Sequence, residues 1–389
     1  MKFFFYLCNI LMKKTGKNMY IRYILFIITI CLALPIGAQK ITLGSCKTRD
    51  GGDYKGELQS GKPHGKGKTT WSNGNTYEGN YEKGRRHGYG VFTFFDGEKY
   101  EGQWMQDHQH GTGTFYYANN NKYVGLWYRD EQEGHGVMTY YNGDLYDGGW
   151  RMGKRHGKGR YTHHNGAYYD GEWANDQKNG NGKYHWPDGS SYEGQWKDNQ
   201  KHGKGTFRYS NGDAYIGSFA NDVQNGKGIY KFSNGDYYDG DYVNGERTGQ
   251  GIFRYANGDR YTGQLLKGAK HGQGTLVWKN GSTYQGEWKN DTPNGRGKLS
   301  MKGGEVFEGQ FLNGKIHGEG IVRYADGSKY RGHFKNGKRN GPAIEQDKEG
   351  NRFEGTYKDD RREGPFVEKD RNGVVTAKGS YTNGKRQTE

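Results

Sequence analysis

Histidines and carboxylates are the residues of this 389-residue chain whose types could support metal binding or acid–base catalysis. Seven of the thirteen histidines recur at multiples of a 23-residue spacing: His64, His87, His110, His156, His202, His271 and His317. Equivalent positions elsewhere hold Asn179, Asn225, Thr248 and Glu133, a set typical of turns. His108, His163 and His164 depart from this spacing and have no cysteine beside them. We therefore interpret the recurring histidines as turn residues and predict no metal site.

Carboxylates also recur at one position of the same spacing: Glu78, Glu101, Asp147, Asp170, Glu193, Asp239, Glu308 and Glu354. A catalytic pair requires one pocket in which two groups acquire different pKa values. A row of equivalent acids on a sheet provides no such pocket, and no single Ser, Cys or Lys is distinguished as a nucleophile. The segment Gly65-Lys66-Gly67-Lys68-Thr69 resembles a phosphate-binding loop, but the required first glycine is replaced by Lys62. We predict neither an enzyme nor a cofactor.

Basic residues recur between the two halves of each 23-residue unit. They are Lys62, Arg85, Arg86, Lys154, Arg155, Lys178, Lys201, Lys270, Lys315, Lys338, Arg339, Arg361 and Arg362. Stacked units would align these residues as a cationic edge, able to attract anionic lipid headgroups, acidic glycans or an acidic protein. The alternative is a solvated edge that keeps the sheet soluble. Nucleic acid is a less suitable partner for an exported protein.

The element that must position these residues is a repeat of 23 residues, which occurs fourteen times without interruption. An aromatic residue begins each unit and is followed two residues later by glycine, from Tyr54 and Gly56 to Phe353 and Gly355. Within one unit, Tyr192, Gly194 and Trp196 share a face of a first strand, and Gly205, Phe207 and Tyr209 share a face of a second, because side chains alternate along a strand. Asn211-Gly212 is typical of a type I′ hairpin turn, and we expect a longer, basic connection around Lys201-His202-Gly203.

The repeated rings predict a thin aromatic core. The residues that we expect to form it include Tyr77, Tyr100, Trp104, Tyr123, Trp127, Tyr146, Trp150, Tyr169, Trp173, Tyr192, Trp196, Tyr284 and Trp288. Gly194 and Gly205 lie on the same face, where the missing Cβ leaves room for a ring. Glycine is 69 of 389 residues, aromatics are 15% and mean hydropathy is −1.16, which fits repeated thin layers and not one thick globular core. A sheet with one aromatic face must curl or meet a second surface.

The unit resembles the MORN-repeat family, whose pattern is Tyr-x-Gly-x-Trp-x-x-Gly-x-x-His-Gly-x-Gly followed by an aromatic strand and Asp/Asn-Gly. Residues 77–90 follow the pattern closely, and the resemblance covers residues 54 to about 386. It implies an all-β, elongated array of stacked antiparallel hairpins in a single curled sheet. It also implies roles in scaffolding, self-association or lipid-headgroup binding. We assign fourteen repeats to residues 54–375. The pattern is lost at Pro342 and Pro365, and residues 376–389 form a displaced half-unit, so we expect a C-terminal cap there.

The first 38 residues are expected to direct export. Basic residues end at Arg22, a 12-residue apolar segment covers residues 23–34, and small residues suit cleavage after Ala38. An uncleaved membrane anchor is the alternative. Residues 39–53 are expected to be a linker. Cys46 is then the one cysteine of the mature chain, which excludes an internal disulfide.

These observations predict a non-catalytic scaffold in the cell envelope, whether periplasmic, envelope-associated or at the cell surface. Its partner would be another protein or a second copy of itself. The alternative is a module that binds anionic lipid headgroups or glycans through its basic loops and aromatic face. The net charge of +15 permits an anionic partner without identifying one.

Overall fold

The computed structural model describes residues 40–387, and all its regular elements are β-strands. The first ten are β1 (Thr42–Lys47), β2 (Asp53–Gln59), β3 (Lys62–Thr70), β4 (Thr76–Glu82), β5 (Arg85–Thr93), β6 (Lys99–Met105), β7 (His108–Tyr116), β8 (Lys122–Tyr128), β9 (Glu131–Thr139) and β10 (Leu145–Arg151). The next ten are β11 (Lys154–Thr162), β12 (Tyr168–Ala174), β13 (Gln177–His185), β14 (Ser191–Lys197), β15 (Gln200–Arg208), β16 (Ala214–Ala220), β17 (Val223–Lys231), β18 (Tyr237–Val243), β19 (Glu246–Arg254) and β20 (Arg260–Leu266). The last are β21 (Ala269–Val277), β22 (Thr283–Lys289), β23 (Thr292–Ser300), β24 (Val306–Leu312), β25 (Lys315–Arg323), β26 (Lys329–Lys335), β27 (Lys338–Gln346), β28 (Arg352–Lys358), β29 (Arg361–Lys369), β30 (Val375–Thr382) and β31 (Lys385–Gln387). Among residues 40–387, no helix is long and apolar enough to cross a membrane.

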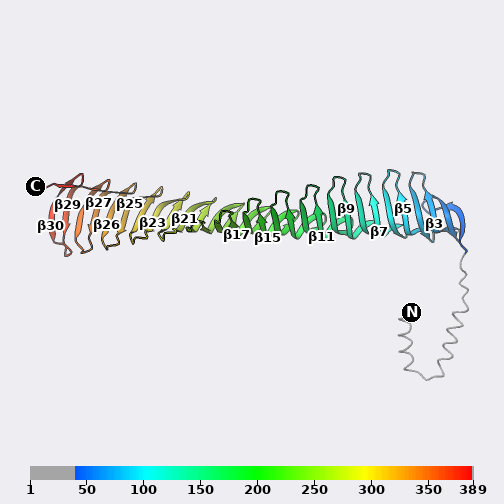
Figure 1. The fold of residues 1–389 in the computed structure, drawn as a ribbon, viewed down its shortest axis with the longest axis horizontal. Coiled ribbons are helices and arrows are strands. Elements are labelled where there is room, and N and C mark those ends of the chain that lie inside the picture. Colours follow the sequence, from blue (N-terminus) through cyan, green and yellow to red (C-terminus); the bar gives the residue numbers. More distant parts are fainter. Residues whose placement is uncertain (1–39, 388–389) are drawn as a thin grey trace, which may run out of the picture. The chain divides into compact units, whose positions relative to one another are not determined.

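The 31 strands are assigned to one antiparallel sheet, and the chain divides into two compact units near residue 118. In the first unit β1 to β7 pair in chain order, and in the second β9 to β31 do the same (Figure 1). The predicted all-β array of antiparallel hairpins is confirmed.

The hairpin turn lies at a different place from the one predicted. β14 ends at Lys197 and β15 begins at Gln200, and these two residues are paired. The two residues between them, Asp198 and Asn199, have φ values of 49° and 68°, as a type I′ turn requires at both central positions. Asp and Asn adopt this left-handed conformation more readily than most residues, so glycine is not needed.

The other two connection assignments are corrected by the same geometry. Lys201, His202 and Gly203 lie inside β15, so the recurring histidine position belongs to a strand and not to a turn. Asn211 and Gly212 lie in the longer connection between β15 and β16, where the Gly212 amide donates to the Tyr209 carbonyl at 3.1 Å. Only Gly212 of these two residues has a positive φ.

The aromatic core forms between neighbouring repeats. Tyr192 is fully buried and Trp196 is 5% exposed. The Trp196 ring meets Tyr192 edge-on at 5.1 Å and Tyr169 of the preceding repeat at 5.3 Å, and its indole N–H donates to the Gly182 carbonyl at 3.0 Å. All thirteen repeat aromatics predicted for the core are buried. Each repeat therefore buries its rings against the next one.

Glycine is required where the two strands of a repeat cross the core. Gly194 is paired with Gly205, and a Cβ on Gly194 would lie 2.5 Å from the Gly205 Cα. A Cβ on Gly205 would lie 2.4 Å from the Tyr192 hydroxyl oxygen. The space above this glycine pair is occupied by the tyrosine ring.

The ends of the described chain are strands. The expected linker of residues 39–53 is corrected, because β1 lies within it and pairs with β2 from Thr42 to Lys47. At the other end, β30 pairs with β29, and the three-residue β31 pairs with β30. The expected signal segment 1–38 lies outside the described residues.

Candidate functional site

The sheet presents two faces of different chemistry. Along β26, Tyr330 and Phe334 are buried on the aromatic face, whereas Arg331, His333 and Lys335 alternate with them. We call the face that carries these three residues, opposite the buried rings, the outer face.

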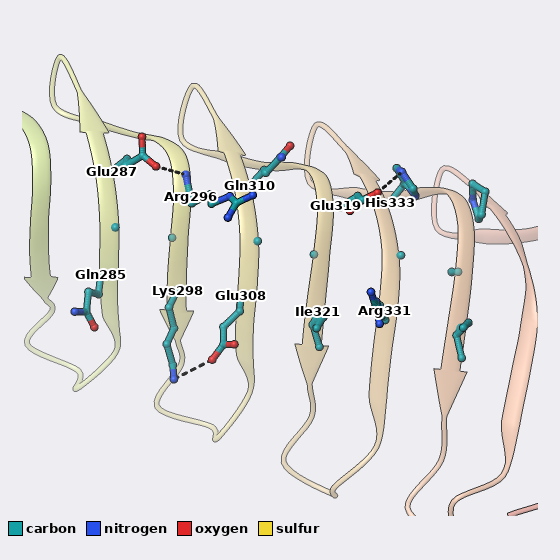
Figure 2. A pocket seen from close by; sticks show the side chains of 18 of the residues that line it. Gln285, Glu287, Arg296, Lys298, Glu308, Gln310, Glu319, Ile321, Arg331 and His333 are labelled. Carbon is teal, nitrogen blue, oxygen red and sulfur yellow. Dashed lines mark hydrogen bonds and ion pairs between the residues drawn. The ribbon is translucent and has the colours of Figure 1, made fainter.

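A groove of about 1040 Å³ crosses the strands on the outer face of the second unit. It extends from β21 to β28, and Figure 2 shows side chains standing on both of its sides. Gly286, Gly297, Gly309 and Gly320 lie between the two sides. Because glycine has no side chain, the floor of the groove is bare backbone.

One wall of the groove is a continuous row of cross-strand neighbours. In order they are Glu308, Ile321, Arg331, Ile344 and Glu354. The opposite wall includes the neighbours Glu319 and His333, followed by Pro342 (Figure 2 labels the first two). Apolar side chains and charges thus alternate along the groove.

The two carboxylates of the first wall, Glu308 and Glu354, have cationic partners. Glu308 lies 3.0 Å from the Lys298 Nζ and 3.3 Å from the Arg323 guanidinium, and these two hydrogen bonds hold the pKa of Glu308 below its ordinary value. Glu354 lies 2.9 Å from Lys369. The Arg331 guanidinium, between Ile321 and Ile344, makes no ion pair with any residue between 40 and 387. The uncompensated charge on this wall is therefore positive.

The thirteen basic residues predicted as one edge lie in two different environments. The first set follows the first residue of the second strand and folds over the buried rings: Arg86, Arg155, Lys178, Lys201, Lys270, Arg339 and Arg362. The Arg155 guanidinium lies 4.5 Å from the Trp173 ring, and its Nε lies 3.0 Å from Asp176. Burial lowers the pKa of Lys178 in the same position. These cations cover the aromatic core and are not aligned on a free edge.

The second set is exposed: Lys62, Arg85, Lys154, Lys315, Lys338 and Arg361. Each is the first residue of a second strand. The row is interrupted in the middle of the chain, where this position holds Gln177, Gln200, Val223, Glu246, Ala269 and Thr292. Among the exposed cations, Lys62 and Arg85 stand in two consecutive repeats, and the last three, Lys315, Lys338 and Arg361, stand in three consecutive repeats.

Two lysines that sequence reasoning missed join those last three. Lys335 is paired with Lys338, and Lys358 is paired with Arg361. We call Lys315, Lys335, Lys338, Lys358 and Arg361 the cation row. All five side chains are exposed, and none forms an ion pair within the described range. The alternation of side chains along the first strand was the available signal, because it places Lys335 and Lys358 on the outer face.

No group of three His, Cys, Asp or Glu side chains that could hold a metal ion occurs between residues 40 and 387. The adjacent His163 and His164 both face Asp144, at 3.5 and 3.1 Å. Burial raises the pKa of Asp144, but hydrogen bonds from the His164 amide and the Tyr161 hydroxyl outweigh burial and hold it below the ordinary value. This cluster joins the connection between β9 and β10, which carries Asp144, to the next such connection, between β11 and β12, which carries the two histidines.

Comparison with known proteins identifies the repeat. The model of the MORN repeat matches fourteen consecutive segments, from 54–76 to 353–373. No curated protein matches the chain. Among solved structures, the TCP10 domain of Danio rerio CPAP matches with a TM-score of 0.30 and 13% identity, covering 56% of this chain and 97% of that one. The TCP domain of SAS-4 (dCPAP) from Drosophila melanogaster, in complex with a proline-rich motif of Ana2, matches with a TM-score of 0.21 and 16% identity, covering 50% and 86%. Scores this low do not establish a shared overall fold.

Proposed function

Because the chain belongs to the MORN-repeat family, whose repeats are protein-binding or membrane-binding scaffolds, we propose that it is a non-catalytic scaffold that binds a protein partner in the cell envelope. The partner is a different protein or a second copy of this chain. The envelope location rests on the expected export signal in residues 1–38.

The groove on the outer face is the observation that carries the proposal. It is open along several repeats, its floor is backbone, and Ile321 and Ile344 stand on its wall beside charged groups. A surface that mixes apolar and charged side chains over a long distance suits a polypeptide. The buried first-strand rings are not available for stacking, which disfavours the open aromatic face considered from sequence.

Site-specific photo-cross-linking in the native host tests this function. A photoreactive residue at Ile321 is expected to capture a protein, either a partner or a second copy of the chain. Ile252 is the matched control, since it holds the equivalent repeat position outside the groove. Equal capture at both positions, or none at either, would contradict the proposal.

A second candidate function is binding of anionic lipid headgroups or glycans, which the cation row favours. Anionic vesicles should then pellet the chain at low salt and lose it at high salt, because exposed charges are screened. A variant that neutralises the cation row should no longer pellet. Failure of vesicles and acidic glycans to bind at low salt rejects this candidate.

A further inference from the structure

We propose that the groove and the cation row together bind an acidic polypeptide segment in extended conformation. This inference rests on the proposed function and specifies the chemistry of its partner. The surface concerned is the outer face of β24 to β29, all within the second unit.

The groove and the cation row are neighbours on one face. Along β26, Arg331 stands on one wall of the groove, His333 on the other, and Lys335 two residues farther along. Residues two apart on a strand are separated by about 7 Å and point to the same side. A ligand segment lying in the groove therefore has the cation row alongside it.

The cation row is unfavourable in the free protein. Lys335 directly faces Lys338, and Lys358 directly faces Arg361, and like charges at directly opposed positions repel. Asp360, in the adjoining turn, is engaged by Arg339 at 3.5 Å, so it does not compensate the row. Asp359 is the remaining carboxylate of that turn, one acid against five cations. An anionic ligand would relieve this repulsion.

The groove adds a second requirement, which distinguishes a polypeptide from a glycan or a headgroup. Ile321 and Ile344 stand beside the unpaired Arg331 on one wall, and Pro342 stands on the opposite wall. Neither a polysaccharide nor a headgroup offers apolar side chains to these residues. A polypeptide can offer both apolar and acidic side chains, because alternate residues of an extended segment point to opposite sides. An extended segment with acidic residues on one side and apolar residues on the other fits both surfaces.

The test measures binding of a defined probe to the full chain by fluorescence anisotropy. Five strand spacings separate β24 from β29, a span that an extended peptide of about eight residues covers. The probe is a fluorescein-labelled peptide of that length with alternating Glu and Val. Its neutral counterpart alternates Gln and Val.

The charge requirement is tested with two variants of equal net charge. The first carries Lys335→Gln, Lys338→Gln, Lys358→Gln and Arg361→Gln. The second neutralises four exposed cations that lie outside the groove and the cation row, through Lys197→Gln, Arg208→Gln, Lys231→Gln and Lys279→Gln. We expect the first variant to bind the Glu–Val peptide about tenfold more weakly at low salt and the second to bind like the parent chain. Cooperative unfolding at melting temperatures no lower than that of the parent chain would show that both are folded.

The apolar requirement is tested with Ile321→Ser combined with Ile344→Ser, which should also weaken the Glu–Val peptide. The inference is overturned if the Gln–Val peptide binds as tightly as the Glu–Val peptide, or if the two quadruple variants behave alike. It is overturned as well if no peptide binds, or if polygalacturonate or phosphatidylglycerol vesicles bind the cation row in place of the peptide. Cross-linking at Ile321 tests the proposed function independently of the peptide experiment. Capture of a partner without an acidic segment would support the scaffold function and would reject only the inference that the ligand is acidic.

Discussion

The Tyr192 hydroxyl donates a hydrogen bond to the backbone carbonyl of Gln195 at 2.9 Å. Gln195 lies where the two strands of the repeat lose register, since Gly194 is paired with Gly205 and Trp196 with Lys201. The hydroxyl therefore satisfies a carbonyl that the strand ladder leaves without a regular partner. The repeat that begins with Phe307 has no such hydroxyl, and there Gln310 is paired with His317 across the strands.

Replacing this tyrosine tests the role of the hydroxyl. Tyr192→Phe should lower the free energy of unfolding by about 1 kcal/mol, because the Gln195 carbonyl loses its donor while the ring remains. Chemical denaturation followed by circular dichroism measures the change. Tyr255→Phe is the control, since the Tyr255 hydroxyl forms no hydrogen bond in the described structure. Equal losses in the two variants would show that the hydroxyl itself contributes nothing.

The buried tyrosines predict loss of stability at high pH. Burial raises the pKa of Tyr215, Tyr238 and Tyr284 to about 12, from an ordinary value of 10.0. In the unfolded chain these groups ionise near the ordinary value, so the unfolded state loses its protons first. The stabilisation is complete below about pH 10 and is lost as the pH rises toward 12. Thermal unfolding between about pH 8 and pH 11.5 should show a falling melting temperature, together with tyrosinate absorbance that appears on unfolding. A melting temperature that stays constant over this range would contradict the burial.

The paired glycines predict strong discrimination between glycine positions. Gly194→Ala should lower the free energy of unfolding by about 1–3 kcal/mol, because its methyl group would meet backbone atoms of the opposite strand that cannot move aside. Gly303→Ala should be nearly neutral, since an added Cβ there meets nothing within 4 Å and the residue has no positive φ. Denaturation of the two variants side by side gives the comparison. Similar changes in the free energy of unfolding would mean that a side chain at Gly194 does not collide with the opposite strand.

The adjacent residues Lys154 and Arg155 are expected to contribute differently to the stability of the fold. Arg155 covers the Trp173 ring and pairs with Asp176, whereas its neighbour Lys154 is exposed. Arg155→Gln should cost about 1–2 kcal/mol of stability and shift the tryptophan emission to the red, because the ring loses its cover. Lys154→Gln removes the same charge and should change neither quantity. If both variants behave alike, the cation–ring contact is not stabilising.

Much of the fold and part of the site follow from the 23-residue period. Alternation along the first strand identifies Tyr192 and Trp196 as core residues, because a buried ring must recur on one face. The turn was misplaced because Asn211-Gly212 is a strong turn signal by composition, whereas Asp198-Asn199 carries no glycine. That error also put Lys154 and Arg155 in one loop, although adjacent residues of a strand point to opposite faces. The groove was not predictable from spacing, because it depends on which side chains stand beside the exposed glycine backbone.

The opposed lysines of the cation row give a prediction in which stability and binding change in opposite directions. Lys338→Glu places a carboxylate directly across from Lys335, replacing a repulsive pair by an attractive one. At low salt the free energy of unfolding should rise by about 0.2–1 kcal/mol, and the gain should fade at high salt because both side chains are exposed. The same variant should bind the Glu–Val peptide more weakly than the parent chain. Lys338→Gln separates removal of repulsion from formation of the new pair. A variant that is no more stable at low salt would show that the two lysines do not interact. An acidic partner would then have no repulsion between them to relieve.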